Sequence, residues 1–79
     1  MSGDVKDQIA AAVSLATTAV RLDQAGRTDI APYFYSEAAK TLENAVKADE
    51  KLAASYSGKI REYQTRAQDL NKTSKSNLQ

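Results

Sequence analysis

Two residue types that carry much of protein chemistry are missing from this sequence, which contains no cysteine and no histidine. Without cysteine there is no disulfide framework and no thiolate nucleophile. Without histidine the chain lacks the commonest general base and a principal zinc ligand. A chain of 79 residues also has no deep interior for a catalytic pocket. We therefore expect no cofactor, no metal site and no enzymatic activity of the chain by itself.

Long apolar runs are missing as well. No window approaches the ~20 apolar residues that a membrane-spanning helix needs. The first residues, Met1 to Asp4, lack the basic segment and apolar stretch of a secretory signal. Basic and acidic residues nearly cancel, leaving a net charge of +1, which favours neither nucleic acid nor an anionic membrane. These absences predict a cytosolic protein that neither binds nucleic acid nor inserts into a membrane.

What the sequence does contain is helical periodicity, because apolar residues recur at steps of three and four in three segments. The predicted buried face of the first segment consists of Ile9, Ala12, Val13, Ala16, Ala19 and Val20. That of the second consists of Ala31, Phe34, Tyr35, Ala38, Leu42 and Ala45. That of the third consists of Leu52, Tyr56, Ile60, Tyr63, Ala67 and Leu70. We expect helices over residues 4–25, 29–48 and 50–72, after a disordered stretch at 1–3 and before a polar tail or linker at 73–79.

The junctions between these segments predict tight turns. Gly26 can adopt the left-handed conformation that closes a helix, and Thr28 is a suitable N-cap for the next one. Pro32 falls in the first turn, where its missing N–H breaks no helical hydrogen bond. Asp49 can cap the third helix. Short turns between amphipathic helices predict an all-α fold, an antiparallel three-helix bundle.

The predicted core of this bundle depends most on its largest apolar side chains, which are Tyr35, Leu42, Ile60, Tyr63 and Leu70. Truncating Ile60 to alanine would cost roughly 2–5 kcal/mol if its side chain were fully buried.

Residues spread over nearly the whole chain, from about Val5 to Leu70, form a recognisable pattern. They are Asp23, Gly26-Arg27, Ala31, Tyr35, Glu37-Ala38-Ala39, Leu42, Ala45, Tyr63, Arg66-Ala67 and Leu70. This pattern resembles the MIT (microtubule-interacting and trafficking) domain. The sequence departs from it at Thr28, where an aromatic residue is usual, and at Pro32, where leucine or a similar residue is usual.

The resemblance implies a non-catalytic three-helix module for protein–protein interaction. Such domains sit beside a catalytic or trafficking module, for example an AAA ATPase or a calpain-like protease. They recruit that module to endosomal membranes by binding C-terminal peptides of ESCRT-III sorting subunits in a groove between two helices. An isolated domain of this kind is expected to be a monomer.

Two other interpretations stay open at this point. The spacing of Ala31, Tyr35 and Ala38 also occurs in tetratricopeptide hairpins, although the sequence shows no second copy of such a repeat. A self-associating helical bundle used only for oligomerisation is the other alternative.

Two grooves are candidates for the bound peptide. The favoured one lies between the first and third helices, and its predicted residues are Ala11, Leu15, Ala19, Leu22, Lys59, Glu62 and Arg66. The alternative lies between the second and third helices, and its predicted residues are Ala39, Glu43, Val46, Arg61, Gln64, Thr65 and Gln68. The first is favoured because the second is mostly polar and lacks the acidic residues that the best-known ATPase members place there. Leu15 and Leu22 are also interpretable as the edge of the core.

Overall fold

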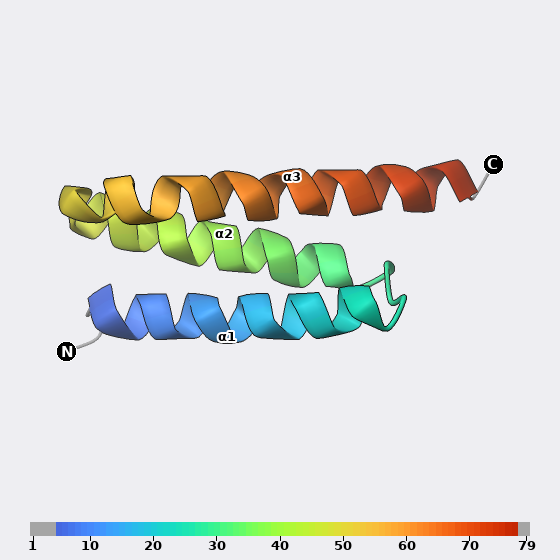
Figure 1. Ribbon diagram of the computed structural model, residues 1–79, viewed down its shortest axis with the longest axis horizontal. Helices are drawn as coiled ribbons and strands as arrows, with labels where there is room; N and C mark the ends of the chain where they lie inside the picture. The colour runs from blue at the N-terminus through green and yellow to red at the C-terminus, as the bar shows by residue number, and fades with distance from the viewer. Residues whose placement is uncertain (1–4, 78–79) are drawn as a thin grey trace.

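The computed structural model describes the backbone of residues 5–77 and the side chains of residues 5–72. Its elements are α1 (Val5–Gln24), α2 (Ala31–Ala48), the short 3-10 helix η1 (Glu50–Leu52) and α3 (Ala53–Asn77). The helices run antiparallel in sequence order (Figure 1), so the predicted all-α three-helix bundle is confirmed. The disordered stretch expected at 1–3 and the last two residues of the expected tail lie outside the described residues.

The turn after α1 is a Schellman motif centred on Gly26, whose φ is 80°. The Arg27 N–H donates to the Leu22 carbonyl over 2.8 Å, and the Gly26 N–H donates to the Asp23 carbonyl over 3.1 Å. These two bonds satisfy carbonyls that the end of a helix would otherwise leave unpaired. The left-handed glycine predicted from the sequence therefore ends α1 and reverses the chain.

Helix α2 begins two residues later than expected, at Ala31 rather than Asp29. The residue at its N-cap is Ile30, whose side chain makes no capping hydrogen bond, so the expectation that Thr28 caps the helix is wrong. The Arg27 carbonyl instead accepts from the Ile30 and Ala31 N–H groups, over 3.3 and 3.0 Å. These two bonds hold the turn that leads into α2.

The third helix also differs from its expected bounds at both ends. Asp49 caps the turn as predicted, with its Oδ1 accepting from the Lys51 N–H over 3.2 Å. The capped element is η1, however, and the α-helix begins only at Ala53. Helix α3 then continues to Asn77, past the expected end at residue 72. The polar sequence after Leu70 has no apolar periodicity, but it contains no proline or glycine to stop a helix already formed.

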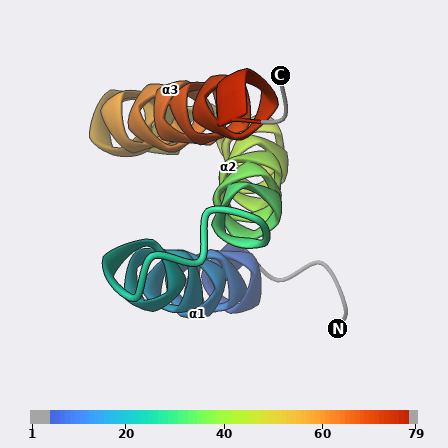
Figure 2. The same cartoon turned by 90° about the vertical axis from the view of Figure 1, so that its right-hand side faces the viewer.

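Helix α2 is the centre of the bundle, because it packs against both α1 and α3 while those two scarcely touch each other. Figure 2 shows α2 beside each of the outer helices. Its buried residues are Ala31, Pro32, Tyr35, Ala38, Ala39, Leu42 and Ala45. Alanines on the facing side of α1 let the two backbones approach closely. The core is therefore built largely from small side chains.

The face that α1 buries is narrower than the sequence pattern indicated. Its buried residues are Ala12, Ala16 and Ala19. Val13 is 56% exposed and Val20 is 39% exposed, so their predicted place in the core is wrong. An alanine row allows α1 to lie close against α2, and the adjacent valines are then left on its flank. Ile60 is likewise only half-buried, whereas Leu42 and Leu70 are buried.

Candidate functional site

A furrow runs between α1 and α3, because neither helix packs directly against the other. Two adjoining hollows that share Val20 and Tyr63 make up this α1/α3 furrow. Its lining residues are Val13, Ala16, Thr17, Val20, Arg21, Tyr35, Lys59, Glu62, Tyr63 and Arg66. The hollow beside Val13 has a volume of about 300 Å³, at the small end for a small-molecule pocket. It suits one or two side chains of a docked segment.

On α1 the furrow uses the opposite flank from the one predicted. At about 100° per residue, Val13 and Val20 lie on one side of the alanine row, and Leu15 and Leu22 lie on the other. Only the first side faces α3. The four predicted α1 residues therefore do not line the furrow: Ala11 is exposed on the far flank, Leu15 and Leu22 are half-buried there, and Ala19 is completely buried.

On α3 the predicted wall is in place, since Lys59, Glu62 and Arg66 all line the furrow. Sequence reasoning missed Tyr63, which it assigns wholly to the core. Its ring is half-buried and lies 6.1 Å from that of Tyr35, measured between ring centroids. The two tyrosines thus serve both the core and the furrow. The signal for the missed α1 residues was present, because Val13 and Val20 have the same seven-residue spacing as Leu15 and Leu22.

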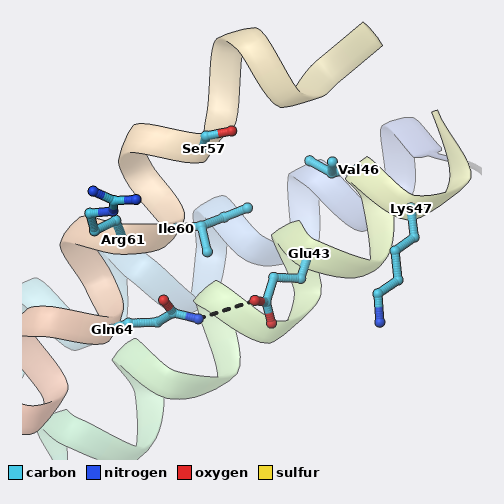
Figure 3. A pocket seen from close by; sticks show the side chains of 7 residues that line it. All are labelled: Glu43, Val46, Lys47, Ser57, Ile60, Arg61 and Gln64. Carbon is cyan, nitrogen blue, oxygen red and sulfur yellow. Dashed lines mark hydrogen bonds between the residues drawn. The ribbon is translucent and has the colours of Figure 1, made fainter. Parts of the chain in front are cut away.

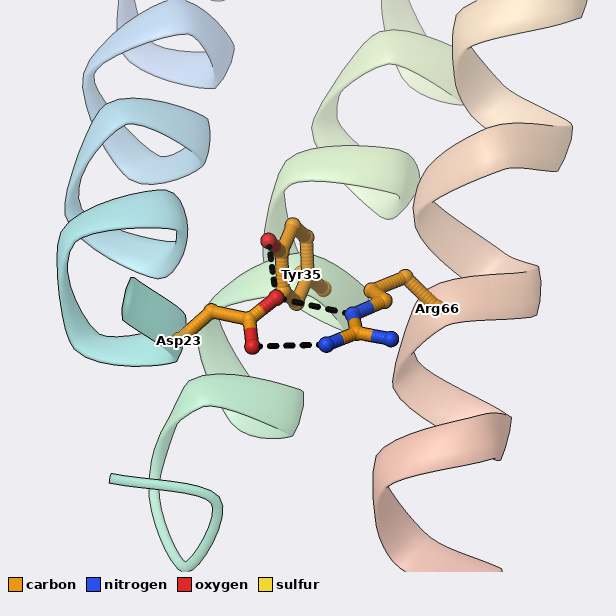
Figure 4. A network of polar contacts seen from close by, with 3 residues as sticks. All are labelled: Asp23, Tyr35 and Arg66. Carbon is orange, nitrogen blue, oxygen red and sulfur yellow. Dashed lines mark hydrogen bonds and ion pairs between the residues drawn. The ribbon is translucent and has the colours of Figure 1, made fainter. Parts of the chain in front are cut away.

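One polar network joins all three helices at the turn end of the furrow (Figure 4). Arg66 of α3 donates from Nε to Asp23 Oδ2 over 2.8 Å and from Nη2 to Asp23 Oδ1 over 2.7 Å. The Tyr35 hydroxyl of α2 donates to Asp23 Oδ2 over 2.8 Å. The Asp23 side chain is only 16% exposed, while that of Arg66 is 47% exposed. The Arg66 guanidinium therefore already forms an ion pair with Asp23 of α1.

The network shifts the pKa values of its members in the directions that its hydrogen bonds require. The Arg66 guanidinium holds the pKa of the Asp23 carboxyl below its ordinary value and is itself held protonated by that carboxylate. Burial, with the neighbouring Asp23 carboxylate, raises the pKa of Tyr35 to about 12. At neutral pH the network thus contains one anion, one cation and one neutral phenol.

We expect these shifts to appear as a pH dependence of stability. An unfolded tyrosine ionises at about pH 10, whereas Tyr35 in the fold does so at about pH 12. Its contribution is complete below pH ~10 and is lost as the pH rises toward ~12. The lowered pKa of Asp23 acts oppositely: its contribution is present above the unfolded value of ~3.9 and is lost as the pH falls below it. Urea unfolding of the native chain and of Tyr35→Phe, measured across the alkaline pH range, checks this prediction. If both proteins lose the same free energy of unfolding between pH ~10 and ~12, the prediction is contradicted.

The second candidate groove is a hollow between α2 and α3, also of about 300 Å³ (Figure 3). Its lining residues are Glu43, Val46, Lys47, Ser57, Ile60, Arg61 and Gln64. Four of the predicted residues are among them, but Ala39 is buried, and Thr65 and Gln68 are exposed outside it. The Gln64 side-chain amide donates to Glu43 Oε2 over 3.1 Å, which links the two walls. The lining of this hollow is more polar than that of the hollow beside Val13, but not more polar than that of the adjoining hollow beside Arg66.

Comparison with known proteins decides the family. A model of the MIT (microtubule interacting and transport) domain matches residues 9–72. The chain belongs to the MIT family. The match covers most of each of the three helices and both candidate grooves, so the chain is not a tetratricopeptide hairpin. The MIT domain is a protein-interaction module. No curated protein and no solved structure matches the chain significantly.

Among the described residues, none of the helices is both long and apolar enough to cross a membrane. The same residues contain no cluster of three or more acidic side chains placed to hold a metal ion.

Proposed function

We propose that this MIT domain binds short C-terminal segments of ESCRT-III-type sorting subunits in the α1/α3 furrow. Binding there would recruit an attached catalytic or trafficking module to endosomal membranes through those subunits. The family supports a role in protein interaction, and the choice of furrow rests on the geometry of α1 and α3.

The observation that carries the choice is exposed apolar surface between two helices. Val13 and Val20 are 56% and 39% exposed, and both line the furrow beside Tyr63. A small domain gains stability by burying such side chains, at roughly 25 cal/mol per Å². Surface that stays exposed between two helices is typical of a groove for an extended or helical segment. In the α2/α3 hollow the apolar residues Val46 and Ile60 are each half-buried, and the hydrogen bond from Gln64 to Glu43 crosses it.

A titration with peptides tests the proposal. Labelled domain is titrated with synthetic C-terminal peptides of ESCRT-III subunits, and NMR shift changes report both the partner and the groove. We expect Val13→Asp to weaken binding at least tenfold, or about 1.4 kcal/mol, because it places a charge in the apolar furrow. Ala11→Asp is the matched control, since it adds the same charge to an exposed position on the other flank of α1.

Three outcomes would count against parts of the proposal. If none of the peptides binds, the ESCRT-III assignment is wrong. Shift changes centred on Val46 and Gln64, with Val13→Asp binding normally, would move the site to the α2/α3 hollow. A stable dimer by light scattering at micromolar concentration would favour the self-association alternative over a monomeric adaptor. Circular dichroism of each variant confirms that the helices are retained.

A further inference from the structure

The charges along the α1/α3 furrow are not equivalent. Three cations line it, namely Arg21 of α1 and Lys59 and Arg66 of α3. Lys59 Nζ lies 3.3 Å from a carboxylate oxygen of Glu62, one turn along the same helix. Arg66 is held by Asp23 through two hydrogen bonds. Two of the three cations are therefore already compensated by the protein itself.

Arg21 is different, because its guanidinium has no hydrogen-bond or ion-pair partner among the described residues. It lines the hollow that also contains Val13, Val20 and Tyr63. The other polar groups of that hollow are the uncharged hydroxyls of Thr17 and Tyr63, and Thr17 already donates its hydroxyl to the Val13 carbonyl over 2.8 Å. The hollow thus combines an apolar surface with a single uncompensated cation at its edge.

Arg21 also lies in the last turn of α1, where a cation interacts favourably with the helix dipole. That interaction, worth typically 0.3–1 kcal/mol at a surface, places no acceptor on the guanidinium. Its donors are arranged as a planar fork that matches a carboxylate with two hydrogen bonds. A ligand that brings a carboxylate to this edge satisfies donors that the domain leaves open.

We propose that Arg21 determines the specificity of the furrow by selecting a peptide segment that pairs an apolar side chain with a nearby acidic one. This inference rests on the proposed function, because it requires that the furrow binds a peptide. The apolar side chain enters the centre of the hollow near Ala16, between Val13 and Val20, and the carboxylate of the acidic residue pairs with Arg21. The other charged residues of the furrow are already paired, Lys59 with Glu62 and Arg66 with Asp23. They therefore add no preference for an acidic or a basic ligand residue.

The geometry of α1 gives the spacing of the two ligand residues. The centre of the hollow near Ala16 and Arg21 are about five residues apart, or roughly 7 Å along the helix axis at ~1.5 Å per residue. Two residues of an extended peptide cover about the same length at ~3.3 Å each, and their side chains point to the same face. In a helical ligand the same distance is about four to five residues, and a separation of four keeps both side chains on one face. The acid is therefore expected two positions from the apolar residue in an extended ligand and four in a helical one.

Selection from a random peptide library tests this directly. Randomised 12-residue peptides displayed on phage, a probe of about the length of a short docking segment, are selected against the 79-residue chain and against Arg21→Glu. Arg61→Glu is the matched control, because it makes the same change in net charge at an exposed position lining only the α2/α3 hollow. Peptides that still bind Val13→Asp are removed, so that only ligands of the furrow are scored.

We expect peptides selected by the native chain and by Arg61→Glu to be enriched in Asp or Glu at the stated spacing from an apolar residue. Peptides selected by Arg21→Glu should lose that enrichment and gain Lys or Arg in its place, with at least a tenfold loss of affinity for the acidic peptides. Furrow-directed peptides without acidic enrichment, or an equal effect of both charge reversals, would overturn the inference while leaving the proposed function intact. A selection that yields no peptide sensitive to Val13→Asp would instead overturn the furrow itself as a peptide site.

Discussion

Leu42→Ala is expected to lower the free energy of unfolding by about 2–5 kcal/mol, which is the usual cost of truncating a buried leucine. Leu42 is 3% exposed and lies on α2, the helix that contacts both of the others. The cavity left by its side chain cannot close easily, because the surrounding helices are already held close together by alanines. In a domain of this size that loss is a large fraction of the total free energy of unfolding. Urea denaturation followed by circular dichroism measures it.

Ile60→Ala is the comparison for this prediction. Ile60 is half-buried and lines the open α2/α3 hollow, so its truncation removes less buried surface and leaves no closed cavity. We expect its cost to be less than half of that for Leu42→Ala. This smaller loss of stability replaces the loss of roughly 2–5 kcal/mol that would follow if Ile60 were fully buried in the core. An Ile60 variant as unstable as the Leu42 variant would show that the hollow is closed in solution.

The second large effect is expected for Asp23→Ala, at about 2–4 kcal/mol. The substitution removes the acceptor of three hydrogen bonds, two of them charge-assisted and donated by Arg66. It also leaves the Tyr35 hydroxyl without its partner in a side chain that is 5% exposed, at a cost of roughly 1–3 kcal/mol. The 47% exposed Arg66 can turn to water, which limits the rest of the loss. Thermal or urea unfolding of the variant provides the measurement.

Tyr35→Phe separates the parts of this effect. It removes one hydrogen bond and leaves no buried donor behind, so its cost should be about 1 kcal/mol. In the double variant the two costs should not add, because both substitutions remove the same Tyr35–Asp23 bond; a coupling of at least ~0.5 kcal/mol is expected. Strictly additive costs would mean that this bond contributes nothing to stability.

The fold was predictable because local signals and periodicity agreed. Gly26 marked the end of the first helix, and Asp49 marked the boundary between the second helix and the next helical element. The helix bounds were less predictable where backbone groups, rather than side chains, hold the end of a helix. The N-cap of α2 is Ile30, a residue with no capping atoms, since the Arg27 carbonyl binds the N–H groups of the turn. No side-chain preference signals such an arrangement.

The candidate site was predictable only in part. The sequence indicated a groove between the first and third helices and the α3 residues Lys59, Glu62 and Arg66 that line it. It could not indicate which flank of α1 faces that groove. Valines flank the alanine row on one side and leucines on the other, at equal spacing, and only the position of the third helix distinguishes them. The prediction chose the flank with the larger leucines, whereas the flank with the valines faces α3.

The network of Asp23, Tyr35 and Arg66 was not predictable as a unit. Its members belong to three different helices, and Asp23 and Arg66 are 43 positions apart in the chain. Helical periodicity reports which residues share a face of one helix, but it does not report which polar groups of separate helices meet. For this reason the sequence pattern indicates only that Arg66 lines the groove, and it does not indicate that Arg66 Nε and Nη2 donate to Asp23.

The arrangement of α1 and α3 about α2 has a mechanical consequence. The outer helices are fastened to each other by the Asp23–Arg66 contact near the turn, whereas Val13 lies ten residues from Asp23, or about 15 Å along α1. At that distance the packing of each helix on α2 is the main determinant of the gap between them. The two outer helices are therefore joined to each other at the Asp23 end of the furrow and can separate more easily at the Val13 end. A bulky ligand residue meets less resistance near Val13 than near Asp23, because the contact of Asp23 with Arg66 ties α1 to α3 at the other end of the furrow.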